Sequence, residues 1–215
     1  MKKRVLIFDL DGTIADTIYS IRDGVNMAMD KYGFPHRSYE QVRAAIGNGA
    51  RELIRLSMPE GEQSNSSLVD SVFKDYDKFY GLTYANVDGC YPNMDKAIRQ
   101  LHKRGYIIAV LSNKQDEYVK KIVDILFPDG VISFAAGQTE LPKKPDPTVP
   151  LMIAQRFNVT PDDCAFIGDS DVDVKTAKNS GMVSVACPWG YRPREELLDA
   201  DFIIEDADEL TLLFE

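Results

Sequence analysis

Two aspartates, Asp9 and Asp11, stand directly after the apolar run Val5–Phe8 and next to a turn residue, Gly12. A continuous apolar run is typical of a central strand in a parallel sheet that is covered on both faces. Side chains alternate along an extended chain, so carboxylates two residues apart can project to the same side. Two such carboxylates repel each other unless a cation lies nearby or one of them carries a proton. The pair predicts a reactive acidic site or, more simply, a charged turn, because Asp and Gly are common turn residues.

Polar groups also follow the later apolar runs of the chain. In an open parallel sheet the ligand crevice lies at the carboxyl ends of the strands, near the point where the strand order reverses. We therefore expect these groups to meet Asp9 and Asp11 at one edge of a sheet. Asp171 is the weakest candidate among them and is expected to be solvated. In chain order the runs and their polar groups are Tyr106–Leu111 with Ser112 and Asn113, Val131–Ala135 with Lys144, and Cys164–Ile167 with Asp169, Asp171 and Asp173.

The elements that must position these groups alternate between helix and strand from Tyr91 onward, as in a parallel sheet with crossover helices. Residues 16–85 instead show helical periodicity and no strand pattern. We expect an α/β fold with a Rossmann-like parallel sheet between two helical layers. Residues 1–15 and 86–215 form this three-layer core, and residues 16–85 form an inserted helical domain.

Composition limits the class of protein further. The chain has 215 residues, 44% hydrophobic and 27% charged, which is ordinary for a globular protein. A formal net charge of -9 argues against a nucleic-acid partner, and no apolar run approaches membrane-spanning length. Three scattered cysteines without metal-type spacing indicate reduced thiols and a cytoplasmic location. The oligomeric state, monomer or homodimer, stays open.

Taken together, these motifs resemble those of the haloacid dehalogenase superfamily of phosphohydrolases, over nearly the whole chain. The matching motifs, in order, are Asp9-Leu10-Asp11-Gly12-Thr13, Ser112-Asn113, Lys144-Pro145, and Gly168-Asp169 with Asp173. The resemblance implies that Asp9 attacks phosphorus to give an aspartyl-phosphate. Asp11 would protonate the leaving oxygen and then activate water. A carboxylate can serve as nucleophile in phosphoryl transfer when the charge of the phosphate is neutralised.

The resemblance also implies a cation and a set of groups that bind phosphate. Mg²⁺ would be held by Asp9, Asp169 and the backbone carbonyl of Asp11, because this hard cation prefers oxygen ligands. Asp173 fits an orienting or water-mediated role at the metal. Lys144 would offset the phosphoryl charge, in preference to its neighbour Lys143, which does not directly precede Pro145. The phosphate oxygens would be bound by Thr13, Ser112 and Asn113.

The helical insert resembles the small cap domain that many of these enzymes carry between the first and second motifs. Within it, Ile46-Gly47-Asn48-Gly49-Ala50-Arg51 resembles the cap loop of phosphoglycolate phosphatases. Gly47, Asn48 and Gly49 would approach the substrate closely, and Arg51 would pair with a carboxylate. The simpler alternative is a loop between helices with a solvated Arg51. The predicted partner is a small phosphorylated metabolite, with 2-phosphoglycolate the best single substrate.

Other functions share these motifs. A nucleotide, sugar-phosphate or pyrophosphate phosphatase would use the same chemistry, and a β-phosphoglucomutase-like enzyme would return the phosphoryl group to a sugar. A dehalogenase would not carry the second aspartate, Asp11. A phospho-acceptor signalling module combines an acceptor aspartate, metal-binding acids and a lysine before proline, but it needs neither a large lid nor Asp11. A catalytically silent binding protein is disfavoured because all four motifs are intact.

Overall fold

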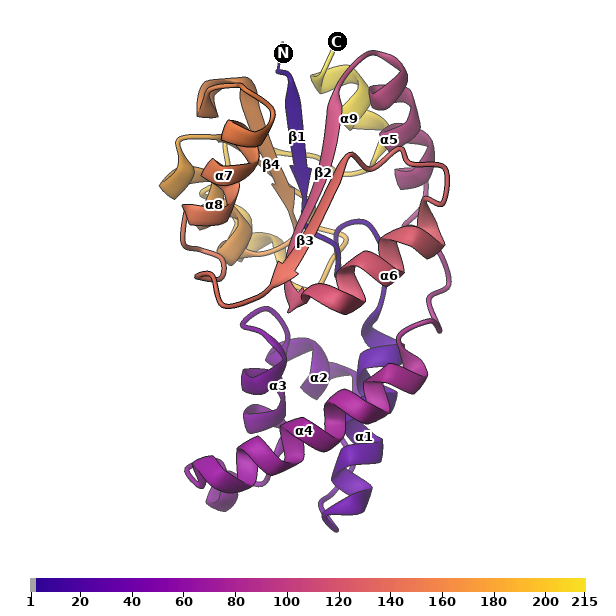
Figure 1. The fold of residues 1–215 in the computed structure, drawn as a ribbon, viewed down its shortest axis with the longest axis vertical. Coiled ribbons are helices and arrows are strands. Elements are labelled where there is room, and N and C mark those ends of the chain that lie inside the picture. Colours follow the sequence, from indigo (N-terminus) through magenta and orange to yellow (C-terminus); the bar gives the residue numbers. More distant parts are fainter. Residues whose placement is uncertain (1–2) are drawn as a thin grey trace. The chain divides into compact units, whose positions relative to one another are not determined.

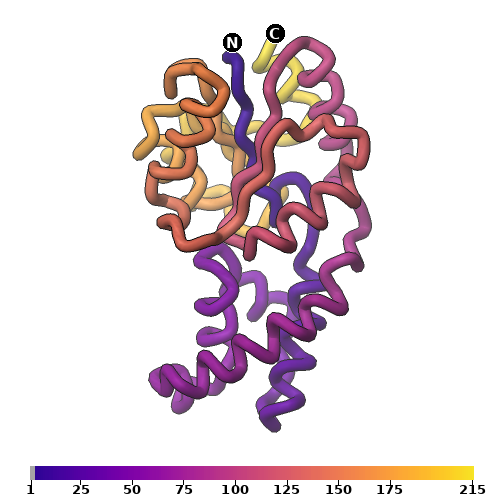
Figure 2. The backbone as a smooth tube through the Cα atoms, in the orientation of Figure 1, coloured from indigo at the N-terminus to yellow at the C-terminus, as the bar shows by residue number. Residues whose placement is uncertain are grey.

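The computed structural model describes residues 3–215 and separates into two compact units. One unit consists of the residues up to Asp16 together with Gly89–Glu215, and the other is Thr17–Asp88. Figure 1 shows the sheet of the first unit, and Figure 2 shows the backbone leaving that unit after its first strand and returning to it once. Among the described residues, no helix combines the length and apolar character needed to cross a membrane.

The first unit is built on a six-stranded sheet in the order β3-β2-β1-β4-β5-β6, and every neighbouring pair is parallel. From β1 the chain builds the sheet first in one direction and then in the other, so the strand order reverses at β1. Parallel α/β sheets bind ligands beside such a reversal. The strands are β1 (Val5–Phe8), β2 (Ile107–Gln115), β3 (Phe134–Gln138), β4 (Cys164–Gly168), β5 (Val183–Ala186) and β6 (Phe202–Ile203).

Helices cover both faces of this sheet, which confirms the predicted three-layer α/β class (Figure 1). On one face, Val5, Ile7 and Phe166 pack with Ile153 and Ala177 of α7 and α8. Burying each large side chain contributes about 1.5–3 kcal/mol. The helices and 3₁₀ turns of this unit are α5 (Met94–Lys103), α6 (Asp116–Leu126), α7 (Thr148–Arg156), η2 (Pro161–Asp163), α8 (Asp171–Ser180), η3 (Arg194–Leu197) and α9 (Asp208–Leu213).

The regular elements of the second unit are all helices, and the structure describes all of its residues. Its longest helix, α4, packs along α1. The two backbones approach closely at Gly24 of α1, where a β-carbon would lie 3.3 Å from the Cα of Tyr80 in α4. The elements are α1 (Ile18–Lys31), α2 (Tyr39–Ala45), α3 (Ala50–Ser57), η1 (Glu60–Glu62) and α4 (Ser66–Thr83).

Two strand boundaries differ from the sequence prediction, and a side-chain cap sets the start of one helix. Strand β2 does not stop at Ser112 but continues to Gln115, which pairs with Gln138 after a register shift. Strand β3 begins at Phe134, because its pairing with Ala109 of β2 starts there. Helix α8 begins at Asp171, because the Ser170 side chain caps it and accepts a hydrogen bond from the Asp173 amide. Backbone pairing between strands and the side-chain cap of α8 set these boundaries, and apolar periodicity does not register them.

Candidate active site

Three buried aspartates converge at the carboxyl edge of the sheet. Asp9 follows β1, Asp169 follows β4, and Asp173 lies in the first turn of α8. One carboxylate oxygen from each lies within 4.8 Å of the others. Because β1 and β4 are neighbours with Phe8 opposite Ile167, the residues that follow them emerge side by side. The strand order therefore brings together acids that are far apart in the sequence.

Asp173 is held from both sides. Its Oδ1 accepts a hydrogen bond from the Lys144 ammonium at 2.7 Å, and its Oδ2 accepts one from the Ser170 amide at 3.1 Å. The second contact belongs to the capping box of α8, in which the cap and third helical residue satisfy each other's backbone amides. Asp173 therefore connects the start of α8 to Lys144.

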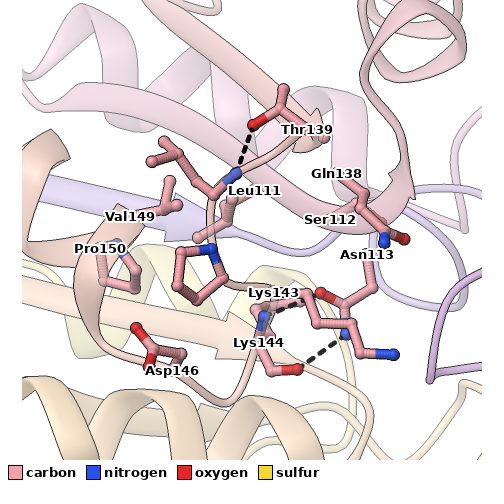
Figure 3. A pocket seen from close by; sticks show the side chains of 13 residues that line it. Leu111, Ser112, Asn113, Gln138, Thr139, Lys143, Lys144, Asp146, Val149 and Pro150 are labelled. Carbon is pink, nitrogen blue, oxygen red and sulfur yellow. Dashed lines mark hydrogen bonds between the residues drawn. The ribbon is translucent and has the colours of Figure 1, made fainter.

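Lys144 is the cation at the centre of this acidic cluster. Its Nζ lies 2.9 Å from Asp9 Oδ1 as well as 2.7 Å from Asp173 Oδ1, and its side chain is 3% exposed. The Asn113 side chain holds the backbone of Lys144 through two hydrogen bonds: Nδ2 donates to its carbonyl at 3.0 Å and Oδ1 accepts from its amide at 2.9 Å. Figure 3 shows this pair beside a small pocket of about 10 Å³, room for about one water molecule.

Asp169 is fixed by the loops after β1 and β5. Thr13 Oγ1 donates to its Oδ1 at 3.1 Å, and the Tyr191 amide donates to its Oδ2 at 2.7 Å. A β-carbon at Gly12 or Gly190 would overlap this carboxylate. The motif pattern identified Gly12 and Thr13 but missed Gly190 and Tyr191, whose signal in the sequence is a glycine between aromatic residues after the fifth strand.

The electrostatics of the cluster reflect acids crowded in a buried site. Burial raises the pKa of Asp9 to about 6, against the opposing charge of Lys144. Burial, together with Asp173 and Asp9, raises the pKa of Asp169 well above its ordinary value. Burial alone would lower the pKa of Lys144, but Asp173 and Asp9 outweigh it and raise that pKa. When all three acids are ionised, they carry more negative charge than Lys144 offsets.

The residues present fit a divalent cation. Asp9 Oδ1 is buried and, despite its ion pair with Lys144, receives no well-directed hydrogen bond from the described residues. Lys144 therefore compensates this oxygen by its charge and not by a directed hydrogen bond, which leaves the oxygen able to ligate a second cation. The donor set of carboxylate oxygens suits hard cations that bind oxygen. A cation at this cluster would also offset the burial and the repulsion between carboxylates that raise the pKa values of Asp9 and Asp169.

The side chain of Asp11 is not part of the cluster formed by Asp9, Asp169 and Asp173. Its side chain turns to Lys114, whose Nζ lies 2.8 Å from each of its two carboxylate oxygens. Lys114 was not among the predicted site residues, although it directly follows Ser112 and Asn113 in the sequence. The Ser112 hydroxyl is buried and lies 3.4 Å from the Lys114 amide.

The predicted cap residues lie in the helical unit. Gly47 and Gly49 both adopt positive φ, at 119° and 87°, in the loop with Asn48 before α3. Arg51 is exposed and bound within that unit: its Nε donates to Asp70 at 2.7 Å and its Nη2 to Ser66 at 3.1 Å. That these residues recognise substrate stays a prediction.

Comparison with known proteins assigns the family. The model of the haloacid dehalogenase-like hydrolases matches residues 6–187. A phosphoglycolate phosphatase from Vibrio cholerae is 30% identical and one from Mannheimia succiniciproducens is 31% identical, each over 96% of this chain and at least 95% of the relative. The chain belongs to the haloacid dehalogenase-like hydrolase family. It is thus an enzyme and a phosphatase of that family, as the motifs predicted.

Solved structures agree with this fold. A predicted phosphoglycolate phosphatase from Haemophilus somnus is 27% identical, with a TM-score of 0.86 over 99% of both chains. The β-phosphoglucomutase of Clostridium difficile is 20% identical, with a TM-score of 0.79 over 97% of this chain and 93% of that one. At that identity, the second similarity shows a shared fold alone.

The tight contact at Gly190 leads to a prediction. In the variant Gly190→Ala, the added methyl group overlaps the Asp169 carboxylate, so the loop after β5 must shift. We expect the free energy of unfolding to fall by about 1–3 kcal/mol, as for other overpacked sites. Divalent cations should also raise the melting temperature less than in the wild type. Denaturant titration and thermal melts with and without Mg²⁺ measure both effects.

The matched control is Gly61→Ala, at a glycine with open space where a β-carbon would stand. It should change the stability by less than about 0.5 kcal/mol. If Gly190→Ala behaved like this control in both measurements, the close packing of the loop on Asp169 would not matter for the site.

Proposed function

We propose that this enzyme is a magnesium-dependent phosphatase that hydrolyses a small phosphate monoester through an aspartyl-phosphate, and that the substrate is 2-phosphoglycolate. The observation that carries the proposal is the convergence of Asp9, Lys144 and the acid cluster at the strand-order reversal. The relatives named phosphoglycolate phosphatase support the substrate. We propose a cytoplasmic location and a small phosphorylated metabolite as partner, with no nucleic acid.

Asp9, Asp169 and the backbone carbonyl of Asp11 would hold the Mg²⁺ ion, with Asp173 orienting the site. When bound, the ion supplies positive charge that neutralises the phosphoryl oxygens. Lys144, whose Nζ lies 2.9 Å from Asp9 Oδ1, contributes further positive charge. Thr13 keeps the Asp169 carboxylate in place. Asn113 acts on the phosphoryl site mainly by fixing the backbone of Lys144.

The covalent steps use Asp9 and Asp11. An Asp9 oxygen attacks phosphorus as the bond from phosphorus to the ester oxygen breaks, and Asp11 gives its proton to that leaving oxygen. A water then attacks the phosphorus of the aspartyl-phosphate, gives a proton to Asp11, and releases phosphate and free Asp9. Covalent relay divides one difficult displacement into two easier ones.

We propose that the helical unit acts as a cap, which excludes water from the reaction and reads the part of the substrate beyond the phosphate. The loop with Gly47, Asn48 and Gly49 has the backbone freedom for a close approach. Arg51 is the candidate partner for the carboxylate of 2-phosphoglycolate. Since Arg51 is bound to Asp70, a substrate carboxylate would have to replace that contact.

The test is a phosphate-release screen over 2-phosphoglycolate, sugar phosphates, nucleotides and pyrophosphate with the purified chain and Mg²⁺. We expect steady multiple turnover, with the highest kcat/KM for 2-phosphoglycolate. Asp9→Asn should lower kcat below detection while retaining the fold, because an amide is a poor nucleophile. A sugar phosphate isomerised without phosphate release would support the mutase instead, and full activity of Asp9→Asn would refute the aspartyl-phosphate.

We expect Mg²⁺ to stabilise the folded protein. Because Mg²⁺ would bind the folded cluster and not the unfolded chain, it should raise the melting temperature. At a free concentration one hundred times the dissociation constant, the gain is about 2.7 kcal/mol. Thermal melts across a Mg²⁺ titration measure it, with Asp169→Asn as the variant that lacks one ligand. A wild-type melting temperature unmoved by millimolar Mg²⁺ would contradict the site.

A further inference from the structure

We propose that Lys114 is a positioning residue that holds the Asp11 carboxylate apart from the acid cluster and orients it for proton transfer. This inference rests on the function proposed above, and it adds a residue that the motifs do not assign. Its basis is the ion pair in which Lys114 Nζ lies 2.8 Å from both Asp11 oxygens.

The ion pair is well placed to fix a side chain. The Lys114 and Asp11 side chains are 6% and 10% exposed, so water screens their charges only weakly. An ammonium that contacts both carboxylate oxygens restrains the direction of the carboxylate as well as its distance. Breaking a buried pair by removing one partner leaves the other charge uncompensated and is costly.

The backbone of Lys114 is itself anchored. It lies in the part of β2 where the pairing with β3 shifts register, and such irregularities redirect side chains. Across from it, Gly137 of β3 packs so closely that a β-carbon there would overlap the Lys114 carbonyl. The Gly137 amide also donates to Asp116 Oδ1 at 2.9 Å. Lys114 therefore reaches Asp11 from a fixed strand end.

Two buried lysines pair with different acids of the site. Lys144 pairs with Asp9 and Asp173, whereas Lys114 pairs with Asp11. Among the described residues, the group able to hold a metal consists of Asp9, Asp169 and Asp173, without Asp11. If Lys114 were removed, the Asp11 carboxylate would lose its counter-charge and could turn to a cation at the cluster. Lys114 thus holds Asp11 clear of the metal-binding group. The pair is formed by the ionised carboxylate, so Asp11 takes up its proton before it acts as the acid.

The experiment compares the wild type with Lys114→Met on two esters, 2-phosphoglycolate or the best alkyl phosphate of the screen, and p-nitrophenyl phosphate. An alkoxide leaves poorly and needs a proton, whereas nitrophenolate leaves readily without one. We expect Lys114→Met to lower kcat on the alkyl ester by roughly 100-fold, at the lower end of what general acid–base catalysis supplies. The loss on the nitrophenyl ester should be much smaller, and Lys114→Arg should restore part of the activity on the alkyl ester.

A double-variant cycle separates positioning from other roles. Because Lys114 acts through Asp11, Lys114→Met should cause no further loss in an Asp11→Asn background. The matched control is Lys143→Met, which removes the exposed lysine that precedes Lys144 in the sequence. It should leave the activity on both esters unchanged. A Mg²⁺ titration by melting temperature gives a readout without turnover: its midpoint should move to lower concentration in Lys114→Met, but not when Asp11→Asn is also present.

Equal losses on both esters, or losses that multiply in the double variant, would overturn the positioning role while leaving the phosphatase intact. If Lys114→Met fails to fold, Lys114→Arg alone decides: it must spare the nitrophenyl ester more than the alkyl ester. A wild type that hydrolyses neither ester would overturn the proposed function, and this inference with it.

Discussion

The physical constraint on which this structure depends is the balance of buried charge at one edge of the sheet. Four buried carboxylates, Asp9, Asp11, Asp169 and Asp173, face two buried ammonium groups, Lys114 and Lys144. When all six groups are ionised, a net charge of two negative units remains. One divalent cation would neutralise it. Removing an ion from water costs several kcal/mol, so an excess of this kind is retained only where partners compensate it.

The topology makes this concentration of charge possible. Strand β1 is central and buried, and β2 and β4 flank it in parallel. The chain segments after all three strands therefore meet at the same edge, and the loop after β5 closes over Asp169. Apolar packing beneath the edge holds the strands in register, so the charged groups are fixed by a scaffold that carries no charge itself. The packing of the core therefore determines the geometry of the site.

The sequence was sufficient for the sheet, its helical layers and the convergence of the acids, because these follow from apolar runs and from the rules for parallel strands. It was not sufficient for Lys114, Gly190 and Tyr191. Lys114 resembles any lysine near a strand end until the register shift in β2 directs it at Asp11. Gly190 matters through a contact with Asp169, which is remote in the sequence. Asp173 was recognised, but its role as the link between α8 and Lys144 required side-chain geometry.

The central claim is that the carboxylate of Asp9 receives the phosphoryl group. The most direct measurement is intact-protein mass spectrometry after rapid acid quenching of the Asp11→Asn variant with substrate and Mg²⁺, followed by peptide mapping. We expect one added phosphoryl group on the peptide that contains Asp9, removable by hydroxylamine as an acyl phosphate. An unmodified Asp9 throughout a turnover in which phosphate is released would contradict the claim.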